Sequence, residues 1–269
     1  MSTADVVAQR AAMPHGTEAI LATRSLATSH RRLAELLSPG VSVLDVGCGT
    51  GAITRDIPRA LRSHVVRVVG VDVNAAFIEE ARRQHAGAAG LTFEVADAYT
   101  LPFRDEFDLV SAARLFQWLR RPADALRAMT AAIRTGGRVV VLDYNHHKLE
   151  WEPAPPASMQ RFYAAFLAWR AEAGMDNAIA DRLHALLRAA GLADVTVTAQ
   201  HETVRRGDPD FAVRAGIWAD VAATRGHQMV ADGAIDEATR AAAEADYRAW
   251  VAADAIRHTM YLLAVDGAR

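Results

Sequence analysis

The chain has 269 residues, of which 51% are hydrophobic and 23% charged, the balance of a globular protein with a sizeable core. The formal net charge of −2 gives no overall positive field to bind nucleic acid or an anionic membrane. The single cysteine, Cys48, excludes an intramolecular disulfide framework and a multi-cysteine zinc site, and no apolar run is long enough for a membrane helix. We therefore expect a cytoplasmic protein without metal, nucleic-acid or membrane partners.

The first forty residues are predicted to be helical. Leucines at positions 21, 26, 33, 36 and 37 recur near helical spacing, and the pattern breaks at Ser38-Pro39-Gly40. Beyond the break, short β-branched runs alternate with helix-like stretches. We predict strands at 41–46, 65–71, 92–95, 107–112 and 138–142, with helices at 75–85 and 122–134. Such alternation is typical of βαβ units and a mainly parallel sheet.

The second half of the chain is less regular. Helices are predicted at 158–173, 181–190, 209–223 and 236–255, and strands at 195–198 and 259–265. The elements together predict an α/β fold, a Rossmann-like, seven-stranded, mostly parallel sheet with helices on both faces and a helical cover over the substrate site. We divide the chain into an N-terminal helical cap at 1–40, a Rossmann-like core at 41–145 and a remainder at 146–269. That remainder would supply the last two strands and two cover insertions, at about 146–180 and 201–256.

A glycine-rich loop follows the first predicted strand. Gly47-x-Gly49-x-x-Ala52 satisfies the dinucleotide-binding pattern, and Asp72 lies 20 residues beyond Ala52, where an acid that binds ribose hydroxyls would stand. This pattern alone fits an NAD-dependent oxidoreductase. Asp45 argues against that interpretation, because a carboxylate two residues before Gly47 would repel a pyrophosphate. The same carboxylate favours a cationic ligand such as S-adenosylmethionine, which has a sulfonium and an ammonium group and no phosphate.

The segment Val43-Leu44-Asp45-Val46-Gly47-Cys48-Gly49-Thr50-Gly51 resembles the first motif of class I S-adenosylmethionine-dependent methyltransferases. Later segments are similar to further motifs of that family and follow in the same order: residues 70–74, 96–98 with 101–103, 107–119 and 134–138. The resemblance covers residues 40–145. It implies a methyltransferase (EC 2.1.1 class) that uses S-adenosyl-L-methionine and releases S-adenosyl-L-homocysteine.

The resemblance also implies a set of cofactor contacts. The glycines would let the backbone pass close under the methionine moiety, where a Cβ atom would collide. Asp45 would meet the ammonium, Asp72 would bind both ribose hydroxyls, and Asp97 would accept from the adenine amino group. Asp45 and Asp97 could instead merely cap a turn or helix, and we interpret Cys48 as a packing residue and not as a nucleophile. The predicted cofactor set is Asp45, Gly47, Cys48, Gly49, Gly51, Asp72, Val73, Asp97, Ala98 and Arg114.

The acceptor is constrained by chemistry more than by motif. Methyl transfer from a sulfonium is an in-line displacement with an activated leaving group, so aligning the acceptor and excluding water matter most. The run Ser111-Ala112-Ala113-Arg114 lacks the proline pair of enzymes that methylate nucleic-acid amino groups. We therefore expect a small-molecule acceptor, methylated at O, N or C in natural-product or secondary metabolism. A general base is needed only where the acceptor's proton is hard to lose.

Substrate residues are expected at the carboxyl ends of the strands, where ligands bind in open α/β sheets. His146 is the best candidate for a general base, because a neutral imidazole can accept a proton near pH 7, and Tyr144 is expected to orient the acceptor. His146 could instead be an ordinary solvated histidine, since the chain has ten histidines. The predicted substrate set is Gln117, Trp118, Asn145, His147, Phe162 and Trp169. The aromatic residues of 158–170 could equally be ordinary helix packing, and His15, Arg24 and His30 could close over the cofactor or form a structural cap.

Within the family, the chain looks most like the broad group that includes ubiquinone/menaquinone-type and natural-product methyltransferases. It departs from that group at Phe116-Gln117-Trp118, where a histidine pair or a His–Trp is more usual. Two alternatives stay open, an NAD-dependent oxidoreductase and a methyltransferase-like protein that binds S-adenosylmethionine without transferring methyl. An amphipathic surface on the late helices could pair two chains as a homodimer.

Overall fold

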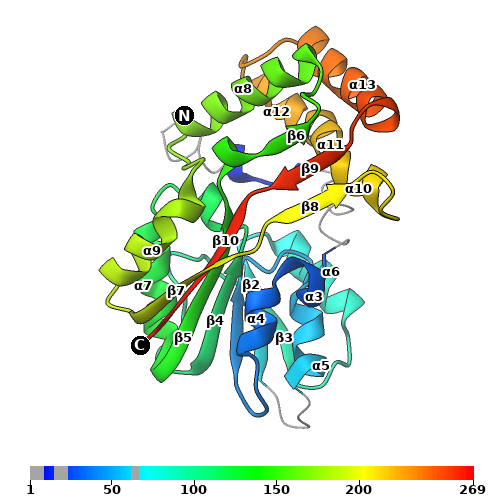
Figure 1. Ribbon diagram of the computed structural model, residues 1–269. Coiled ribbons are helices and arrows are strands. Elements are labelled where there is room, and N and C mark those ends of the chain that lie inside the picture. Colours follow the sequence, from blue (N-terminus) through cyan, green and yellow to red (C-terminus); the bar gives the residue numbers. More distant parts are fainter. Residues whose placement is uncertain (1–8, 15–23, 62–66) are drawn as a thin grey trace.

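The computed structural model describes residues 9–14, 24–61 and 67–269 (Figure 1). Its main sheet has seven strands in the order β3-β2-β1-β4-β5-β10-β7. The strands are β1 (Val43–Val46), β2 (Val68–Asp72), β3 (Leu91–Val95), β4 (Phe107–Ala113), β5 (Ile133–Tyr144), β7 (Ala193–Ala199) and β10 (Leu262–Ala268). Strand β10 runs antiparallel to β5 and β7, and the other pairs of neighbouring strands in this sheet are parallel. The predicted α/β fold with a seven-stranded, mostly parallel sheet is thus confirmed.

Helices cover both faces of this sheet. One face carries α7 (Pro122–Ala132) and α9 (Ile179–Ala189), and the other carries α3 (Leu26–Ser29), α4 (Arg31–Leu36), the short helix η1 (Thr54–Asp56), α5 (Ile57–Leu61) and α6 (Ala75–Gln84). Alternating residues of one strand supply both cores. Leu44 and Val46 pack on the side of α7 and α9, whereas Val43 packs with Leu33 and Ile57 on the opposite side.

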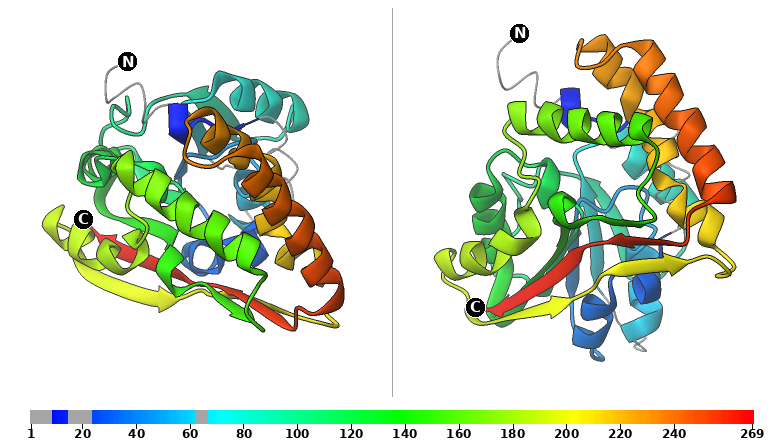
Figure 2. Two further views of the ribbon diagram at one scale, coloured as in Figure 1. Left: turned by 90° about the horizontal axis from the view of Figure 1, so that it is seen from above. Right: turned by 45° about the horizontal axis from the view of Figure 1, so that its top comes forward.

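A helical cap lies above the carboxyl ends of the parallel strands (Figures 1 and 2). It consists of α8 (Ala157–Glu172), α10 (Phe211–Ala215), α11 (Ile217–Ala223), α12 (Arg225–Ala231) and α13 (Glu237–Ala253). Aromatic residues of the cap share one buried cluster with Leu142 and Tyr144, at the end of β5. The cap therefore closes the edge of the sheet at which ligands of α/β proteins bind.

The structure differs from the sequence prediction in several elements. A second, three-stranded sheet has the order β6-β9-β8, made of β6 (Glu150–Glu152), β9 (Arg257–Met260) and β8 (Glu202–Arg205), and was not predicted. The single strand predicted at 259–265 is divided between the two sheets at Tyr261. The helix predicted at 209–223 is divided at Gly216, and α12 was not predicted.

The N-terminal part of the chain contacts both the cap and the sheet. The Arg10 Nε atom donates to Asp232 Oδ2 at 2.9 Å, next to α12, and the segment at residues 9–14 lies beside α8 in Figure 2. Further along, Arg32 on α4 donates to Asp266 on β10 at 2.7 Å. His15 lies outside the described residues.

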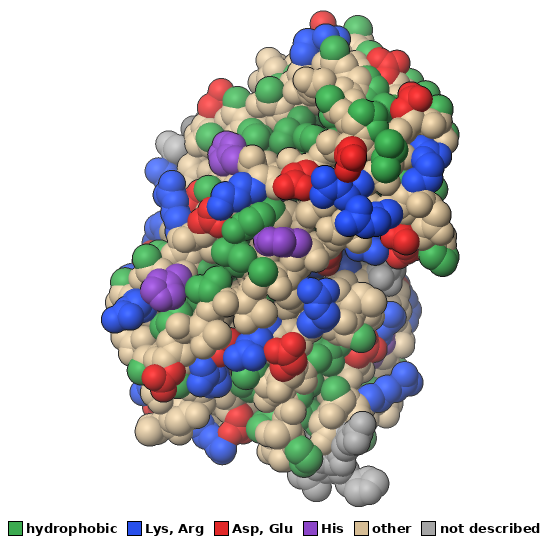
Figure 3. Space-filling view, in the orientation of Figure 1, with side chains coloured by type: hydrophobic (Ala, Val, Ile, Leu, Met, Phe, Trp, Pro, Cys, Tyr) green, Lys and Arg blue, Asp and Glu red, His purple; other side chains and the backbone are tan. Residues whose placement is uncertain are grey.

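The described residues include no helix that is both long and apolar enough to cross a membrane. Nor do they bring together three or more potential metal ligands. On the face seen in Figure 3, basic and acidic side chains are interspersed, without a broad basic patch.

Candidate functional site

The glycine loop after β1 has a backbone that only glycine adopts easily. Gly47, Gly49 and Gly51 have φ angles of 74°, 56° and 79°, all in the left-handed region. A Cβ atom on Gly47 would come within 3.1 Å of the Leu115 side chain. The loop therefore turns sharply at the end of β1 and stays close to the segment that follows β4.

Asp45, one residue inside the end of β1, is buried beneath this loop. Its carboxylate accepts a 2.7 Å hydrogen bond from the Thr54 hydroxyl, at the start of η1. Burial raises the pKa of Asp45 to about 6, and hydrogen bonding from Thr54 and Ser111 only partly opposes this rise. A cationic ligand would stabilise the ionised form of this buried carboxyl group.

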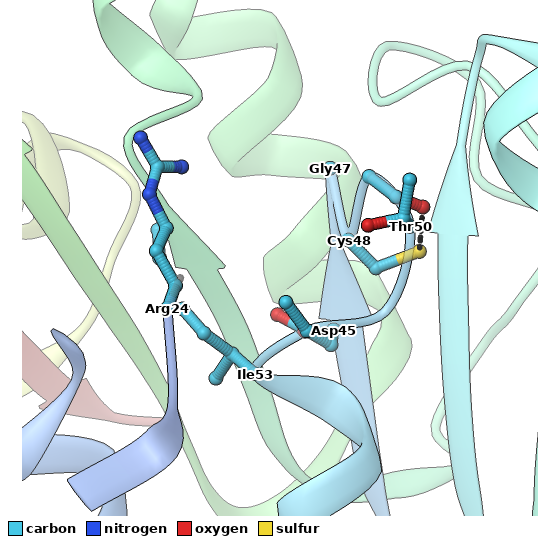
Figure 4. Close-up of a pocket in the computed structure, with 9 residues that line it drawn as sticks. Arg24, Asp45, Gly47, Cys48, Thr50 and Ile53 are labelled. Atoms are coloured by element: carbon cyan, nitrogen blue, oxygen red, sulfur yellow. Dashed lines mark hydrogen bonds between the residues drawn. The ribbon is translucent and has the colours of Figure 1, made fainter. Parts of the chain in front are cut away.

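A cavity of about 40 Å³ lies between Asp45 and the glycine loop, room for a small polar group (Figure 4). Arg24, on the segment that faces the loop, lines the same cavity. The Cys48 thiol contacts the Gly49 carbonyl at 3.6 Å, and burial raises its pKa well above the usual range. A thiol that stays protonated fits the packing role expected for Cys48.

Asp72, at the end of β2, fixes the loop from the other side. One of its carboxylate oxygens accepts from the Gly49 amide and the other from the Asn74 amide, each at 2.9 Å. An ionised carboxylate has about four acceptor sites, so Asp72 can accept from a ligand hydroxyl in addition to these amides. Burial raises the pKa of Asp72, and these backbone hydrogen bonds oppose the rise.

An apolar ledge lies beside Asp72, at the carboxyl ends of β2 and β3. Val73 is 71% exposed and Val95 is 51% exposed, and Val95 pairs with Asp72 across the two strands. Sequence reasoning selected Val73 and missed Val95, because only the strand register places them together. Asp97, in the turn after β3 that also contains Ala98, is exposed and accepts from the Tyr99 amide at 2.9 Å.

Arg114 joins three parts of the chain at the end of β4. Its φ of 59° is in the left-handed region, and its guanidinium donates to the Tyr144 hydroxyl at 2.7 Å, to the Ser29 carbonyl at 3.0 Å and to Glu202. Burial lowers the pKa of the neighbouring His30 to about 3, so that this ring stays neutral. These three hydrogen bonds of Arg114 are all made to the protein itself. They connect the N-terminal segment, β5 and β8.

A buried polar network follows β4 and β5. His146 Nε2 lies 2.8 Å from Gln117 Oε1, which also accepts from Arg170 Nη1 at 3.1 Å. Because this oxygen is an acceptor, the His146 proton is on Nε2 and the Nδ1 atom has the lone pair. The Tyr163 hydroxyl donates to the His146 carbonyl at 2.7 Å. Burial, and then Arg170, lower the pKa of His146 well below its usual value, so the ring is a weak base.

The remaining predicted substrate residues lie in different surroundings. Trp118 is half-buried next to Arg170, in the same region as Gln117 and His146. Asn145 donates to Asp181 at 2.9 Å, towards α9, and His147 is exposed. Phe162 and Trp169 are buried inside the cap, as expected if the aromatic residues of α8 are packing residues. Their roles as substrate contacts stay predictions.

Residues 43–137 match a family model described as a methyltransferase domain. Over 110 residues the chain is 37% identical to a ubiquinone/menaquinone biosynthesis C-methyltransferase of Hahella chejuensis, covering 39% of this chain and 44% of that protein. Over 181 residues it is 31% identical to the O-methyltransferase cnsE of Penicillium expansum, covering 65% of this chain and 61% of that protein. The chain thus spans less than two thirds of the length of these curated relatives.

A solved structure has the same fold. The phosphoethanolamine N-methyltransferase 2 of Haemonchus contortus, in complex with phosphomonomethylethanolamine and S-adenosylhomocysteine, superposes with a TM-score of 0.54. The match covers 96% of this chain and 54% of that chain at 15% sequence identity. At this level of identity the similarity concerns the fold alone.

Proposed function

We propose that this chain is a class I S-adenosylmethionine-dependent methyltransferase, because residues 43–137 match a methyltransferase domain, and that it methylates an O, N or C atom of a small molecule. Its cofactor is S-adenosylmethionine. The observation that carries the proposal is the buried Asp45 carboxylate on the cavity under the glycine loop. This arrangement suits an ammonium group and opposes a pyrophosphate, which disfavours the NAD-dependent alternative.

The residues around the loop fit the cofactor part by part. Asp45 would hold the ammonium, and Asp72, with both oxygens already oriented by backbone amides, would hold the ribose hydroxyls. The ledge of Val73 and Val95 offers apolar surface for the adenine ring. Arg24, which lines the cavity opposite the loop, is suited to the methionine carboxylate.

S-adenosylmethionine supplies an activated methyl group, so the chain's own residues need mainly to position the acceptor and exclude water. The cap closes the carboxyl ends of the strands, which supports an enclosed small-molecule acceptor. His146 Nδ1 is the ring atom able to take a proton, but its low basicity limits this contribution. We therefore assign most of the rate to proximity, with Gln117 and Arg170 holding His146 and with Arg114 holding the Tyr144 hydroxyl.

Calorimetric titration with S-adenosylhomocysteine, with NAD in parallel, tests the cofactor assignment. We expect heat from S-adenosylhomocysteine and none from NAD; the reverse result would favour an oxidoreductase. A panel of small acceptors with methyl-labelled S-adenosylmethionine then tests transfer. Cofactor binding without any labelled product would favour a protein that binds S-adenosylmethionine for another purpose.

Asp72→Ala should weaken S-adenosylhomocysteine binding by about 2 kcal/mol, roughly 30-fold, because it removes charge-assisted hydrogen bonds to the ribose. Asp254→Ala is the matched control, since Asp254 is exposed at the C-terminal end of α13 and has no predicted role in the cofactor site. An Asp72→Ala protein with wild-type affinity would remove Asp72 from the ribose site. The cytoplasmic location, the absence of a nucleic-acid partner and the homodimer stay predictions.

A further inference from the structure

Four arginines are buried among the residues that the structure describes: Arg114, Arg170, Arg225 and Arg240. Arg114 and Arg240 each form ion pairs with glutamates. Within the described ranges, neither Arg170 nor Arg225 has a carboxylate at ion-pair distance, although they are only 0% and 4% exposed. Burying a charge without a counter-charge is costly, so two such side chains in one place indicate a site that needs positive charge.

The guanidinium groups of Arg170 and Arg225 both contact Trp118. The Cζ atom of Arg170, on α8, lies 4.4 Å from the centroid of the Trp118 ring, and that of Arg225, at the start of α12, lies 3.9 Å from it. Trp118 ends the short helix η2 (Phe116–Trp118), which follows β4, and the preceding Leu115 packs against Gly47. The cluster therefore connects the cap, through α8 and α12, to the segment after β4 that contacts the cofactor loop. Ligands of α/β proteins bind at this end of the strands.

The hydrogen bonds that these two arginines donate are accepted by neutral groups. Arg170 donates to Gln117 Oε1 at 3.1 Å, to the Gln117 carbonyl at 2.8 Å and to Asn177 Oδ1 at 2.9 Å. Its charge is partly offset by the nearby Asp143, whose oxygens accept from backbone amides. Burial nevertheless lowers the pKa of Arg170 to about 10.

The positive charge of Arg225 is less well compensated than that of Arg170. It donates to the carbonyls of Arg10 and Ala12 at 3.0 and 3.3 Å, to Gln228 Oε1 at 3.3 Å and to the Met13 sulfur at 2.9 Å. Burial and the Arg170 charge lower its pKa to about 9. A thioether is a poor acceptor for a guanidinium, and Met13 is itself only half-buried. An anionic oxygen group that replaced Met13 would form a stronger, charge-assisted hydrogen bond.

We propose that the methyl acceptor carries a carboxylate, which binds Arg225 beside Trp118 while Arg170 adds positive charge. The inference rests on the proposed function and specifies its substrate class. The planar Trp118 ring would support the apolar part of the acceptor, and the guanidinium of Arg225 would fix its orientation. An acceptor that lacks an anionic group would add no counter-charge to either arginine.

The test compares benzoate with benzamide, which have similar shapes and differ in charge, by titration into the S-adenosylhomocysteine-loaded protein. We expect benzoate to bind at least about 10-fold more tightly. Arg225→Gln should abolish this preference, so that benzoate binds no more tightly than benzamide. Arg188→Gln, at an exposed arginine of α9, should keep the preference and serves as the matched control.

Equal binding of the two probes, no benzoate binding at millimolar concentration, or a preference that survives Arg225→Gln would each overturn the proposal. Arg225 also anchors residues 10–13, so circular dichroism must show that the variant is folded. Where it is not, Arg225→Lys keeps the charge and loses the forked geometry, and should reduce the preference without abolishing it. Failure to bind S-adenosylhomocysteine would instead count against the proposed function.

Discussion

Asp45 is buried and its pKa is raised, so its protonation should control cofactor binding. Its pKa is raised to about 6 from 3.8, so the ligand-free protein favours the neutral carboxyl below that pH. This group favours the folded state at low pH, and its contribution is lost as the pH rises through 6. A bound ammonium reverses the preference, because it stabilises the ionised form.

We predict that S-adenosylhomocysteine affinity rises between pH 5 and pH 7, by up to about 10-fold per pH unit below the pKa, and then levels off. Calorimetric titration at a series of pH values measures this rise. Asp45→Asn keeps the shape and the Thr54 hydrogen bond but cannot ionise, so its affinity should be low and independent of pH over this range. A wild-type protein with a flat profile would mean that Asp45 does not meet the ammonium.

The residues that sequence motifs select for the cofactor site stand close together along the chain, and their roles stay predictions. The glycines, Asp45 and Asp72 stand within one strand–loop–helix segment or at the end of the next strand, where spacing along the chain fixes position in space. Glu202, which pairs with Arg114 from 88 residues away, gave no such signal. Arg225 gave no such signal either, because the role that we propose for it depends on its burial and on its neighbours in the fold, which a sequence does not show.

Helix α9 illustrates what sequence pattern predicts for an element. Leu183 and Leu187, one turn apart, are 0% exposed against the sheet, and Gly191 follows the helix with a φ of 84°, as expected for a C-terminal cap. The predicted range of 181–190 is close to the observed Ile179–Ala189. Amphipathic period and a capping glycine are both local signals.

Because Leu183 is fully buried, Leu183→Ala should lower the free energy of unfolding by about 3 kcal/mol, as for other buried leucines. Leu186→Ala, on the same helix at a partly exposed position, should cost clearly less. Urea unfolding of both variants measures the difference. Equal losses would show that α9 is held by something other than its buried face.

Elements whose ends depend on tertiary contacts were harder to predict. The helix expected at 209–223 is divided at Gly216, where a Cβ atom would come within 2.6 Å of the Ala212 carbonyl. Strands β6, β8 and β9 have only three or four residues each and pair across long stretches of chain, so no periodic pattern could distinguish them from loops. The break at Tyr261 follows from this, since β9 joins that small sheet.

At the scale of the whole molecule, buried charges connect segments that are distant in sequence. Asp266 on β10 is 0% exposed and pairs with Arg32 on α4 at 2.7 Å and with Arg138 on β5 at 2.6 Å. The sequence predicted a seven-stranded, mostly parallel sheet, but not this junction. It also gave no indication that Arg10 reaches Asp232, 222 residues further along the chain.

Asp266→Asn should therefore lower the free energy of unfolding by about 3 kcal/mol, since it removes the common counter-charge of two partly buried arginines and leaves them close together. The loss should fall short of the extreme for a fully buried pair, because the Arg32 and Arg138 side chains remain 21% and 27% exposed. Glu150→Gln is the control: its ion pair with Arg257 is on the surface, and its removal should cost less than about 1 kcal/mol. Urea unfolding measures both. Limited proteolysis adds a local readout, because residues near α4 should be cut faster in Asp266→Asn if this carboxylate holds the N-terminal helices on the sheet. Unchanged cleavage together with an unchanged unfolding midpoint would assign that attachment to the apolar contacts of Leu26 and Leu33 alone.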